Sequence, residues 1–186
     1  MRQLFLDIET TGFSREWNEI IELAAAIYDT EEKTIVDSFH MYARPVKGIP
    51  ANITELTGIT NEMVANCRPE WDMLVSFCDW YDDHKIDCII GHNCKSFDLQ
   101  FIRAKCDKYS LHWNDRGATV IDTLAYARQL KKKGVLRTEN LKQPTIAAFY
   151  GISYEAHSAL SDVRALIKIY QKMVESETPA RATLGF

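Results

Sequence analysis

The sequence has few of the residues that crosslink or anchor a chain. Its five cysteines are odd in number, and none lies in a Cys-x-x-Cys pair, which argues against a disulfide framework or a structural zinc site. No apolar run approaches the roughly 20 residues of a membrane helix. The opening residues carry acids where a signal peptide needs an apolar core. We therefore expect the cytoplasm or another reducing intracellular compartment, and no membrane association.

A surplus of positive charge is also lacking. The chain has 22 Lys and Arg against 26 Asp and Glu, a net charge of −4, which excludes a protein that binds nucleic acid by net charge alone. Its 186 residues, 46% of them apolar, suffice to bury a core without crosslinks. We expect a single domain over residues 1–175 and a short tail over residues 176–186, because Pro179 and small residues follow the last periodic segment.

The hydrophobic pattern predicts strands followed by helices that alternate with further strands. Expected strands cover residues 3–8, 20–28, 34–42, 87–91 and 119–121, with a hairpin turn at 29–33 and a loop at 45–50. Expected helices cover residues 71–81, 97–108, a stretch from 122, residues 140–150, and a last helix with apolar residues from Leu160 to Val174. This order is typical of an α/β fold with a mixed sheet.

The first unusual feature is a pair of acids at the end of an apolar strand. Asp7 and Glu9 are two positions apart, so strand geometry points both side chains to one face, with Cα atoms about 6.6 Å apart. Two such carboxylates repel each other unless a cation neutralises them. Gly12 permits a tight turn directly afterwards. A solvated turn is the simpler interpretation of the pair taken alone.

Two further segments combine histidine with an acid. His92 to Asp98 follows the strand at 87–91, and Ser96 is a candidate cap that places Asp98 in the first turn of the next helix. His157 precedes the last helix, and Asp162 lies near its start. Each acid is also explained by a favourable interaction with the helix dipole. Positions five apart point about 140° apart on a helix, so separate roles suit His157 and Asp162.

Together these segments supply four carboxylates and a histidine at the ends of secondary elements. Oxygen ligands suit Mg²⁺ or Mn²⁺ better than zinc. Two such ions about 3.5–4 Å apart hold the attacking and leaving oxygens of a phosphodiester. The composition therefore favours a two-metal phosphodiester chemistry.

These motifs resemble the DEDDh 3′–5′ exonuclease family, whose members include proofreading epsilon-type and three-prime-repair-type enzymes. The resemblance rests on Asp7-Ile8-Glu9-Thr10-Thr11-Gly12, on His92-Asn93 with Phe97-Asp98, and on His157 followed by Asp162. Three residues separate Asn93 from Phe97, as in the three-prime-repair type, whereas many relatives have two. Residues 55–60 (ELTGIT) resemble a further family segment that borders the nucleotide site.

The resemblance implies an RNase H-like fold with a five-stranded mixed sheet flanked by helices. It also implies that Asp7 bridges two cations, that Glu9 and Asp162 complete the first ion site, and that Asp98 holds the second ion. His157 becomes the general base that takes a proton from the attacking water. The implied activity releases nucleoside 5′-monophosphates from the 3′ end of single-stranded or frayed DNA.

The resemblance also implies substrate contacts around the acids. The expected residues are Thr10, Thr11, Gly12, Phe13, Leu56, His92, Asn93 and Phe97, with apolar side chains stacking on the terminal nucleotide. Ordinary core packing remains an alternative for Leu56 and Phe97, and a structural role remains one for His92.

Two features bear on partners. Arg128, residues 131–133 (KKK), Arg137 and Lys142 form the densest basic stretch, which either follows a phosphate backbone or is a solvated linker. Residues 181–186 (RATLGF) faintly resemble a sliding-clamp-binding peptide, with arginine where glutamine belongs, so contact with a polymerase or clamp is a hypothesis beside a plain flexible tail.

Three other functions stay open. An exoribonuclease that trims RNA uses the same residues, because nothing in the sequence reads the 2′-hydroxyl. An endonuclease of the RNase H type uses similar ions. A non-catalytic nucleic-acid-binding or docking module also fits the fold, although all five expected active-site residues are present.

Overall fold

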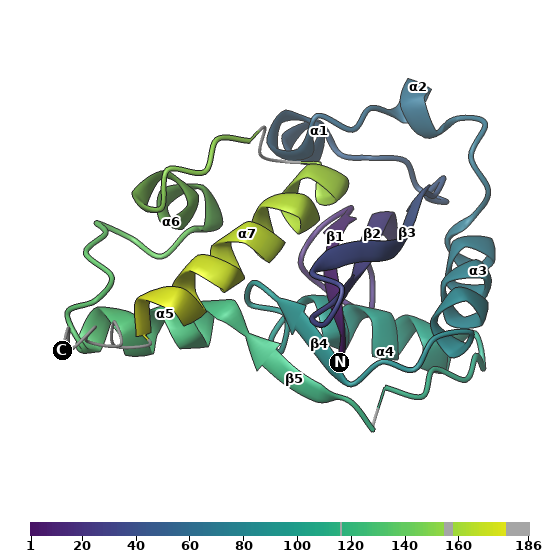
Figure 1. The fold of residues 1–186 in the computed structure, drawn as a ribbon. Helices are drawn as coiled ribbons and strands as arrows, with labels where there is room; N and C mark the ends of the chain where they lie inside the picture. Colours follow the sequence, from purple (N-terminus) through teal and green to yellow (C-terminus); the bar gives the residue numbers. More distant parts are fainter. Residues whose placement is uncertain (116, 155–157, 178–186) are drawn as a thin grey trace, which may run out of the picture.

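The computed structural model describes residues 1–115, 117–154 and 158–177. A five-stranded mixed sheet forms its centre in the order β3-β2-β1-β4-β5 (Figure 1). The strands are β1 (Arg2–Thr10), β2 (Ile20–Asp29), β3 (Thr34–Tyr42), β4 (Cys88–Gly91) and β5 (Thr119–Asp122). The first three pair antiparallel, whereas β4 and β5 extend the sheet in parallel from β1. The expected mixed sheet is therefore confirmed.

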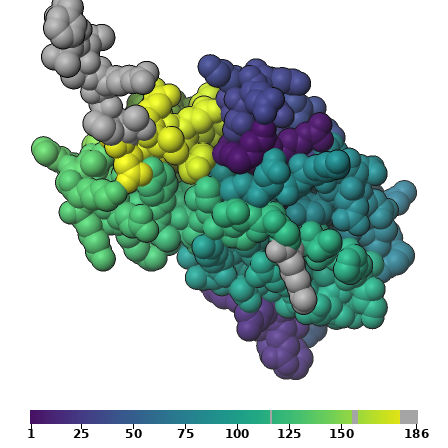
Figure 2. Space-filling model, turned by 60° about the horizontal axis from the view of Figure 1, so that its bottom comes forward, coloured from purple at the N-terminus to yellow at the C-terminus, as the bar shows by residue number. Residues whose placement is uncertain are grey.

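Helices cover both faces of this sheet. They are α1 (Ala51–Thr57), α2 (Asn61–Val64), α3 (Glu70–Asp82), α4 (Asp98–Lys108), α5 (Thr123–Lys132), α6 (Gln143–Phe149) and α7 (Ala159–Glu177). In Figure 1, α3 and α4 lie on one side of β1, while α5, α6 and α7 gather on the other. Figure 2 shows the yellow surface of α7 bordered by the green surface of the α5 region.

Strand β1 alternates between the two faces and thereby sets the position of the acids. Leu4, Leu6 and Ile8 pack into the cluster formed with α3 and α4. Phe5 packs into the cluster formed with α7. Because side chains alternate along a strand, Asp7 and Glu9 share the face of Phe5 and lie on the α7 side.

The α7 side of β2 is made of small residues. Ala24 and Ala26 are buried there beneath Ala159, Val163 and Leu166 of α7. Small side chains let the helix lie close to the sheet, because no bulky group separates the two backbones. The close approach brings the first turn of α7 near the carboxyl end of β1.

The expected elements differ from the observed ones mainly in short helices. Helices α1 and α2 are not expected from the sequence, and they bury Ile53 and Val64 in a cluster with Ile21 of β2. The helix expected over 140–150 begins only at α6, after Lys142. The domain end expected at residue 175 falls inside α7, and the rest of the expected tail from residue 178 lies outside the described residues.

Candidate active site

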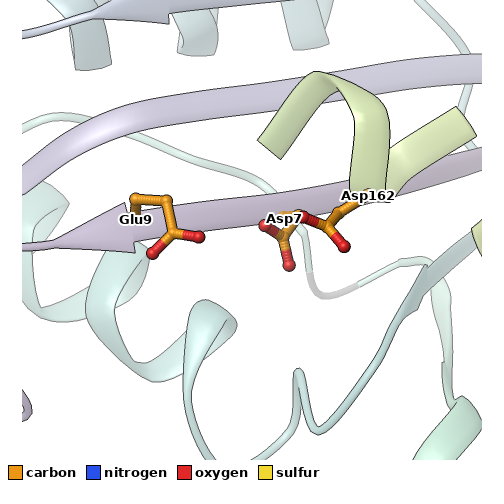
Figure 3. Close-up of side chains that lie close together, drawn as sticks. All are labelled: Asp7, Glu9 and Asp162. Carbon is orange, nitrogen blue, oxygen red and sulfur yellow. The ribbon is translucent and has the colours of Figure 1, made fainter. Parts of the chain in front are cut away.

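The acids expected from the sequence meet in one place. Asp7 and Glu9 come from the carboxyl end of β1, and Asp162 comes from the first turn of α7. One carboxylate oxygen from each of the three lies within 4.8 Å of the others. Figure 3 shows the carboxylates of Asp7 and Asp162 side by side, with that of Glu9 farther along β1.

Asp98 joins these three acids in the wall of one cavity. The cavity has a volume of about 250 Å³ and is lined by Asp7, Ile8, Glu9, His92, Asn93, Phe97, Asp98, Gln143, Pro144 and Asp162. Asp98 is buried at the start of α4, and its Oδ1 accepts a hydrogen bond of 3.2 Å from the backbone N–H of Ile8. That bond fixes the fourth carboxylate to the strand that carries the first two.

The local structure before Asp98 differs from the expectation in one respect. Ser96 was expected to cap α4, but the residue at the cap position is Phe97, whose side chain makes no capping hydrogen bond. The turn is instead held by Asp122 at the end of β5, whose carboxylate accepts backbone N–H groups of Asn93 and Lys95. The turn before α4 is therefore fixed by a residue of β5 and not by a local cap.

The electrostatics of the cavity favour a cation. Burial and the charges of Asp98 and Glu9 raise the pKa of Asp7 well above its usual range. Burial and the charge of Glu22 raise the pKa of Glu9 to about 8. Burial also raises the pKa of Asp98 to about 7, although hydrogen bonds from backbone N–H groups oppose the shift. Like charges at this spacing ionise together only with a counter-ion.

The donor set fits a hard divalent cation. All four groups are carboxylates, the ligand type preferred by Mg²⁺ and Mn²⁺, and the cavity side chains offer no thiolate. Asp7, Glu9 and Asp162 already bring ligand atoms together without a cation.

His92 and Asn93 line the cavity, and the ring nitrogens of His92 are engaged within the protein. The two ring nitrogens of His92 lie 3.0 Å from the hydroxyl of Thr123 and 3.0 Å from the carbonyl of Leu141. Burial lowers the pKa of His92. Asn93 has a left-handed backbone, with φ of 66°, at the turn after β4. His92 therefore links the turn after β4 to the start of α5 and to the segment that precedes α6.

The loop after β1 is tightly held by its own side chains. The hydroxyl of Thr10 donates to the carbonyl of Gly12 at 2.6 Å, and that of Thr11 accepts the N–H of Glu19 at 3.0 Å. A Cβ added to Gly12 would lie 2.8 Å from the side chain of Asn18, so a larger residue does not fit there without a shift. Thr10 and Thr11, expected to contact nucleotide, are buried and hold this loop.

The three apolar residues expected to stack on a nucleotide differ in exposure. Phe13 is 79% exposed, and its ring meets the edge of Phe97 with centroids 6.4 Å apart. Phe97 is partly buried and lines the carboxylate cavity. Leu56, on α1, is about half exposed, which contradicts the alternative that it is a core residue. Phe13 and Leu56 are thus available to a ligand.

Sequence reasoning missed two residues next to the acids. Gln143, at the start of α6, donates from Nε2 to Oδ1 of Asp162 at 3.0 Å. Glu22 of β2 is fully buried, and its charge contributes to the raised pKa of Glu9. No sequence motif marks Gln143, whereas an acid within the apolar run at 20–28 was a visible signal for Glu22. His157, the expected general base, lies outside the described residues.

Size alone does not identify this site. A larger cavity of about 640 Å³ lies at the end of α4, against His112, Trp113 and Asp115. Its Asp115 carboxylate is already paired with Arg103 at 2.6 Å. The smaller cavity is the one in which four acids converge, and burial raises the pKa of three of them, Asp7, Glu9 and Asp98.

The basic stretch is partly engaged within the protein. Lys131 donates to the carbonyl of Thr138 at 2.5 Å, and Lys133 forms an ion pair with Glu177. Arg128 is exposed on α5, and its charge is one of the causes that lower the pKa of His92. Arg128 is thus the basic residue of this stretch with an electrostatic link to the cavity wall.

The fold and the site define a class of protein: an RNase H-like α/β domain with a carboxylate cluster at the end of its first strand. A family model for RNase T-type exonucleases matches residues 4–170. The chain therefore belongs to the DEDD-type 3′–5′ exonuclease family and is a hydrolase of the nuclease class. Members of this family depend on divalent metal ions.

Curated relatives agree with this assignment. The chain is 35% identical over 170 residues to a PolC-type DNA polymerase III of Caldanaerobacter subterraneus, and 33% identical over 170 residues to that of Bacillus subtilis. Both matches cover 91% of this chain and 11% of the relative. The chain thus spans about a tenth of the length of these relatives.

Solved structures share the fold. A structure of Exonuclease I superposes with a TM-score of 0.81 at 21% identity, over 96% of this chain and 41% of that one. Exonuclease I of E. coli in complex with a dA16 oligonucleotide gives a TM-score of 0.81 at 20% identity, with the same coverage of both chains. These likenesses confirm the RNase H-like architecture.

Within the ranges that the structure describes, no helix has the length and apolar character of a membrane span.

Proposed function

We propose that this chain removes nucleotides one at a time from the 3′ end of single-stranded or frayed DNA, with two Mg²⁺ or Mn²⁺ ions held by Asp7, Glu9, Asp98 and Asp162. The observation that carries the proposal is the convergence of these carboxylates, three of which place ligand atoms within 4.8 Å of one another. The shared cavity and the raised pKa values support the inclusion of Asp98.

The reaction adds water across a phosphodiester. The water oxygen joins the phosphorus of the terminal nucleotide, and the bond from that phosphorus to the 3′-oxygen of the preceding nucleotide breaks. The cations supply positive charge that stabilises the attacking and leaving oxygens. In this proposal His157 accepts the proton of the water, and the 3′-oxygen leaves as a hydroxyl after protonation from solvent.

The residues of the chain divide the remaining tasks. The four acids hold the cations, and Gln143 fixes Asp162 by donating to its carboxylate at 3.0 Å. Phe13, Leu56 and Phe97 stack against the terminal nucleotide, which orients its phosphodiester toward the acids. Stacking of this kind tolerates any base, as proofreading or degradation requires.

DNA is the proposed substrate because of the relatives. The curated relatives are DNA polymerases, and Exonuclease I has been crystallised with a dA16 oligonucleotide. We further propose that the chain acts with a replicative DNA polymerase, as a domain or as a separate subunit. The tail proposed to contact a clamp, residues 181–186, lies outside the described residues.

One experiment separates the proposed activity from its alternatives. Linear DNA and RNA oligonucleotides of identical sequence, labelled at the 5′ end, are incubated with the protein and Mn²⁺ beside circular single-stranded DNA. We expect a ladder that shortens from the 3′ end on DNA, release of 5′-monophosphates, and an intact circle. Cleavage of the circle would indicate an endonuclease, and preference for RNA would indicate a trimming exoribonuclease. Binding without any product would indicate a docking module.

A further inference from the structure

A fifth carboxylate lies directly behind the proposed metal ligands. Glu22 of β2 is the cross-strand neighbour of Glu9 and is 0% exposed. It lies on the same side of the strand as Ala24 and Ala26, the side that α7 covers. Burial of a carboxylate without partners destabilises the fold by several kcal/mol. The polar partners of Glu22 are therefore needed to keep it inside the protein.

The partners of Glu22 connect three elements. One oxygen, Oε1, lies 2.7 Å from Nε2 of His40 on β3. The other, Oε2, accepts a hydrogen bond of 3.2 Å from the backbone N–H of Ala159. The hydroxyl of Tyr42 is hydrogen-bonded to Glu22. Burial and the charge of Glu22 raise the pKa of Tyr42 to about 12. The carboxylate of Glu22 thus contacts β3 through one oxygen and accepts a hydrogen bond from α7 through the other.

The hydrogen bond from Ala159 to Glu22 is made at the start of α7. Ala159 is the first residue of α7, and Asp162 lies in the same first turn. The N–H groups of a first turn have no acceptor inside the helix, so an outside acceptor fixes where the helix begins. The apolar contact of α7 with Ala24 and Ala26 is non-directional, whereas a hydrogen bond specifies one position.

We propose that Glu22 is a positioning residue that pins the first turn of α7 to the sheet and thereby holds Asp162 within reach of Asp7 and Glu9. Its acceptor oxygen, rather than its charge, is what the role requires. Glu22 itself does not contact the cation. This inference rests on the proposed function, because it assumes that the three acids bind a divalent cation.

The test measures Mn²⁺ binding in the absence of DNA, by isothermal titration calorimetry, beside urea unfolding of each variant. Glu22→Ala removes the acceptor, and we expect Mn²⁺ affinity to fall about 10- to 100-fold, the range for residues that orient metal ligands. Glu22→Gln keeps an acceptor oxygen at the same reach. We therefore expect its Mn²⁺ affinity to be close to that of the wild type.

Glu70, the first residue of α3, provides a matched control because it too accepts a backbone N–H across a helix–sheet contact. It is also buried, and it accepts the backbone N–H of Ile20 on β2 at 2.7 Å and the hydroxyl of Tyr109 at 2.8 Å. Glu70→Ala should lower stability without changing Mn²⁺ affinity, since it holds α3 rather than α7. An equal loss of Mn²⁺ affinity in Glu22→Ala and Glu70→Ala would overturn the proposal, because it would indicate general destabilisation.

A second variant decides the question if Glu22→Ala does not fold. Ala159→Pro deletes the N–H that Glu22 accepts, and proline is tolerated at the first position of a helix. We expect this variant to weaken Mn²⁺ binding as well, and unchanged affinity in the folded variant would overturn the proposal. A wild type that binds Mn²⁺ but degrades no DNA would remove the proposed function while leaving the role of Glu22 intact.

Discussion

The pKa of Asp7 is raised by burial and by the negative charges around it. Asp98, Glu9, Asp162 and Glu22 all raise its pKa, in addition to burial. An acid with a raised pKa binds more protons in the folded than in the unfolded protein, so the metal-free fold loses stability as pH rises. The site is therefore a source of instability that a bound cation relieves.

The first prediction concerns this instability. In chelator at pH 8, Asp7→Asn should raise the free energy of unfolding by about 1–2 kcal/mol, because it removes a buried negative charge among like charges, and it should abolish turnover. Urea unfolding at pH 6 and pH 8 measures the effect, which should be smaller at pH 6. Asp79→Asn, at an exposed acid of α3, is the control and should change little. A less stable Asp7→Asn protein at pH 8 would contradict the account.

The second prediction concerns metal binding and pH. Glu9, with a pKa of about 8, and Asp98, with a pKa of about 7, must lose their protons to bind a cation. Mn²⁺ affinity should therefore rise between pH 6 and pH 8, by about tenfold per pH unit for each proton released. Calorimetry in two buffers of different ionisation enthalpy counts these protons. Binding at pH 7 without proton release would show that the acids are already ionised.

At the scale of elements, the loop between β1 and β2 is held by internal hydrogen bonds and presents an exposed aromatic ring. Its backbone is closed by a hydrogen bond of 2.9 Å from Thr11 to Glu19, and Asn18 accepts the N–H of Ser14 at 2.9 Å. An exposed side chain on such a loop binds a ligand with little loss of conformational freedom. Phe13 is the residue so presented.

The third prediction follows for this loop. Phe13→Ala should weaken binding of single-stranded DNA by about 1–3 kcal/mol, the range for one base stacked on an aromatic ring, and leave Mn²⁺ affinity unchanged. Fluorescence anisotropy in Ca²⁺ measures binding without turnover. Phe149→Ala, at a partly exposed phenylalanine at the end of α6, is the control. Equal affinities for the wild type and Phe13→Ala would remove Phe13 from the binding surface.

At the scale of the whole molecule, the negative net charge must be reconciled with the polyanionic substrate that we propose. The acids of the site are matched by cations only when metal is bound, so the approach of DNA depends on local positive charge. Arg128 and Lys132 are exposed on α5, and the charge of Arg128 acts on His92 in the cavity wall. Lys33 and Lys85 lie near the amino ends of β1 and β4, at the other end of β1 from the acids.

The fourth prediction compares these two pairs at equal net charge. Reversal of Arg128 and Lys132 to Glu should weaken DNA binding and reduce the slope of log affinity against log salt by about 1.4, as expected for two lost phosphate contacts on a single strand. Reversal of Lys33 and Lys85 should change the slope much less. If both double variants behave alike, the basic stretch is a solvated linker.

The hydrophobic pattern was enough to locate the strands from the sequence. β3 was expected at its observed bounds, and β1 and β2 were found within two residues at each end. Helices α1 and α2 are too short for a helical period to stand out, and their burial comes from contact with β2. Short helices that are buried only by tertiary contact therefore give little signal in the sequence.

The sequence by itself determined the acids and one of their relations. Asp7 and Glu9 share a face because strand periodicity is a local property, and the family follows from motifs read in order. Only the tertiary structure decided that Asp162 meets them, that Gln143 and Glu22 support the site, and that the hydroxyls of Thr10 and Thr11 are engaged within the loop. Those facts depend on how α7, α6 and the loop pack against the sheet, and such long-range packing leaves no periodic signal in the chain.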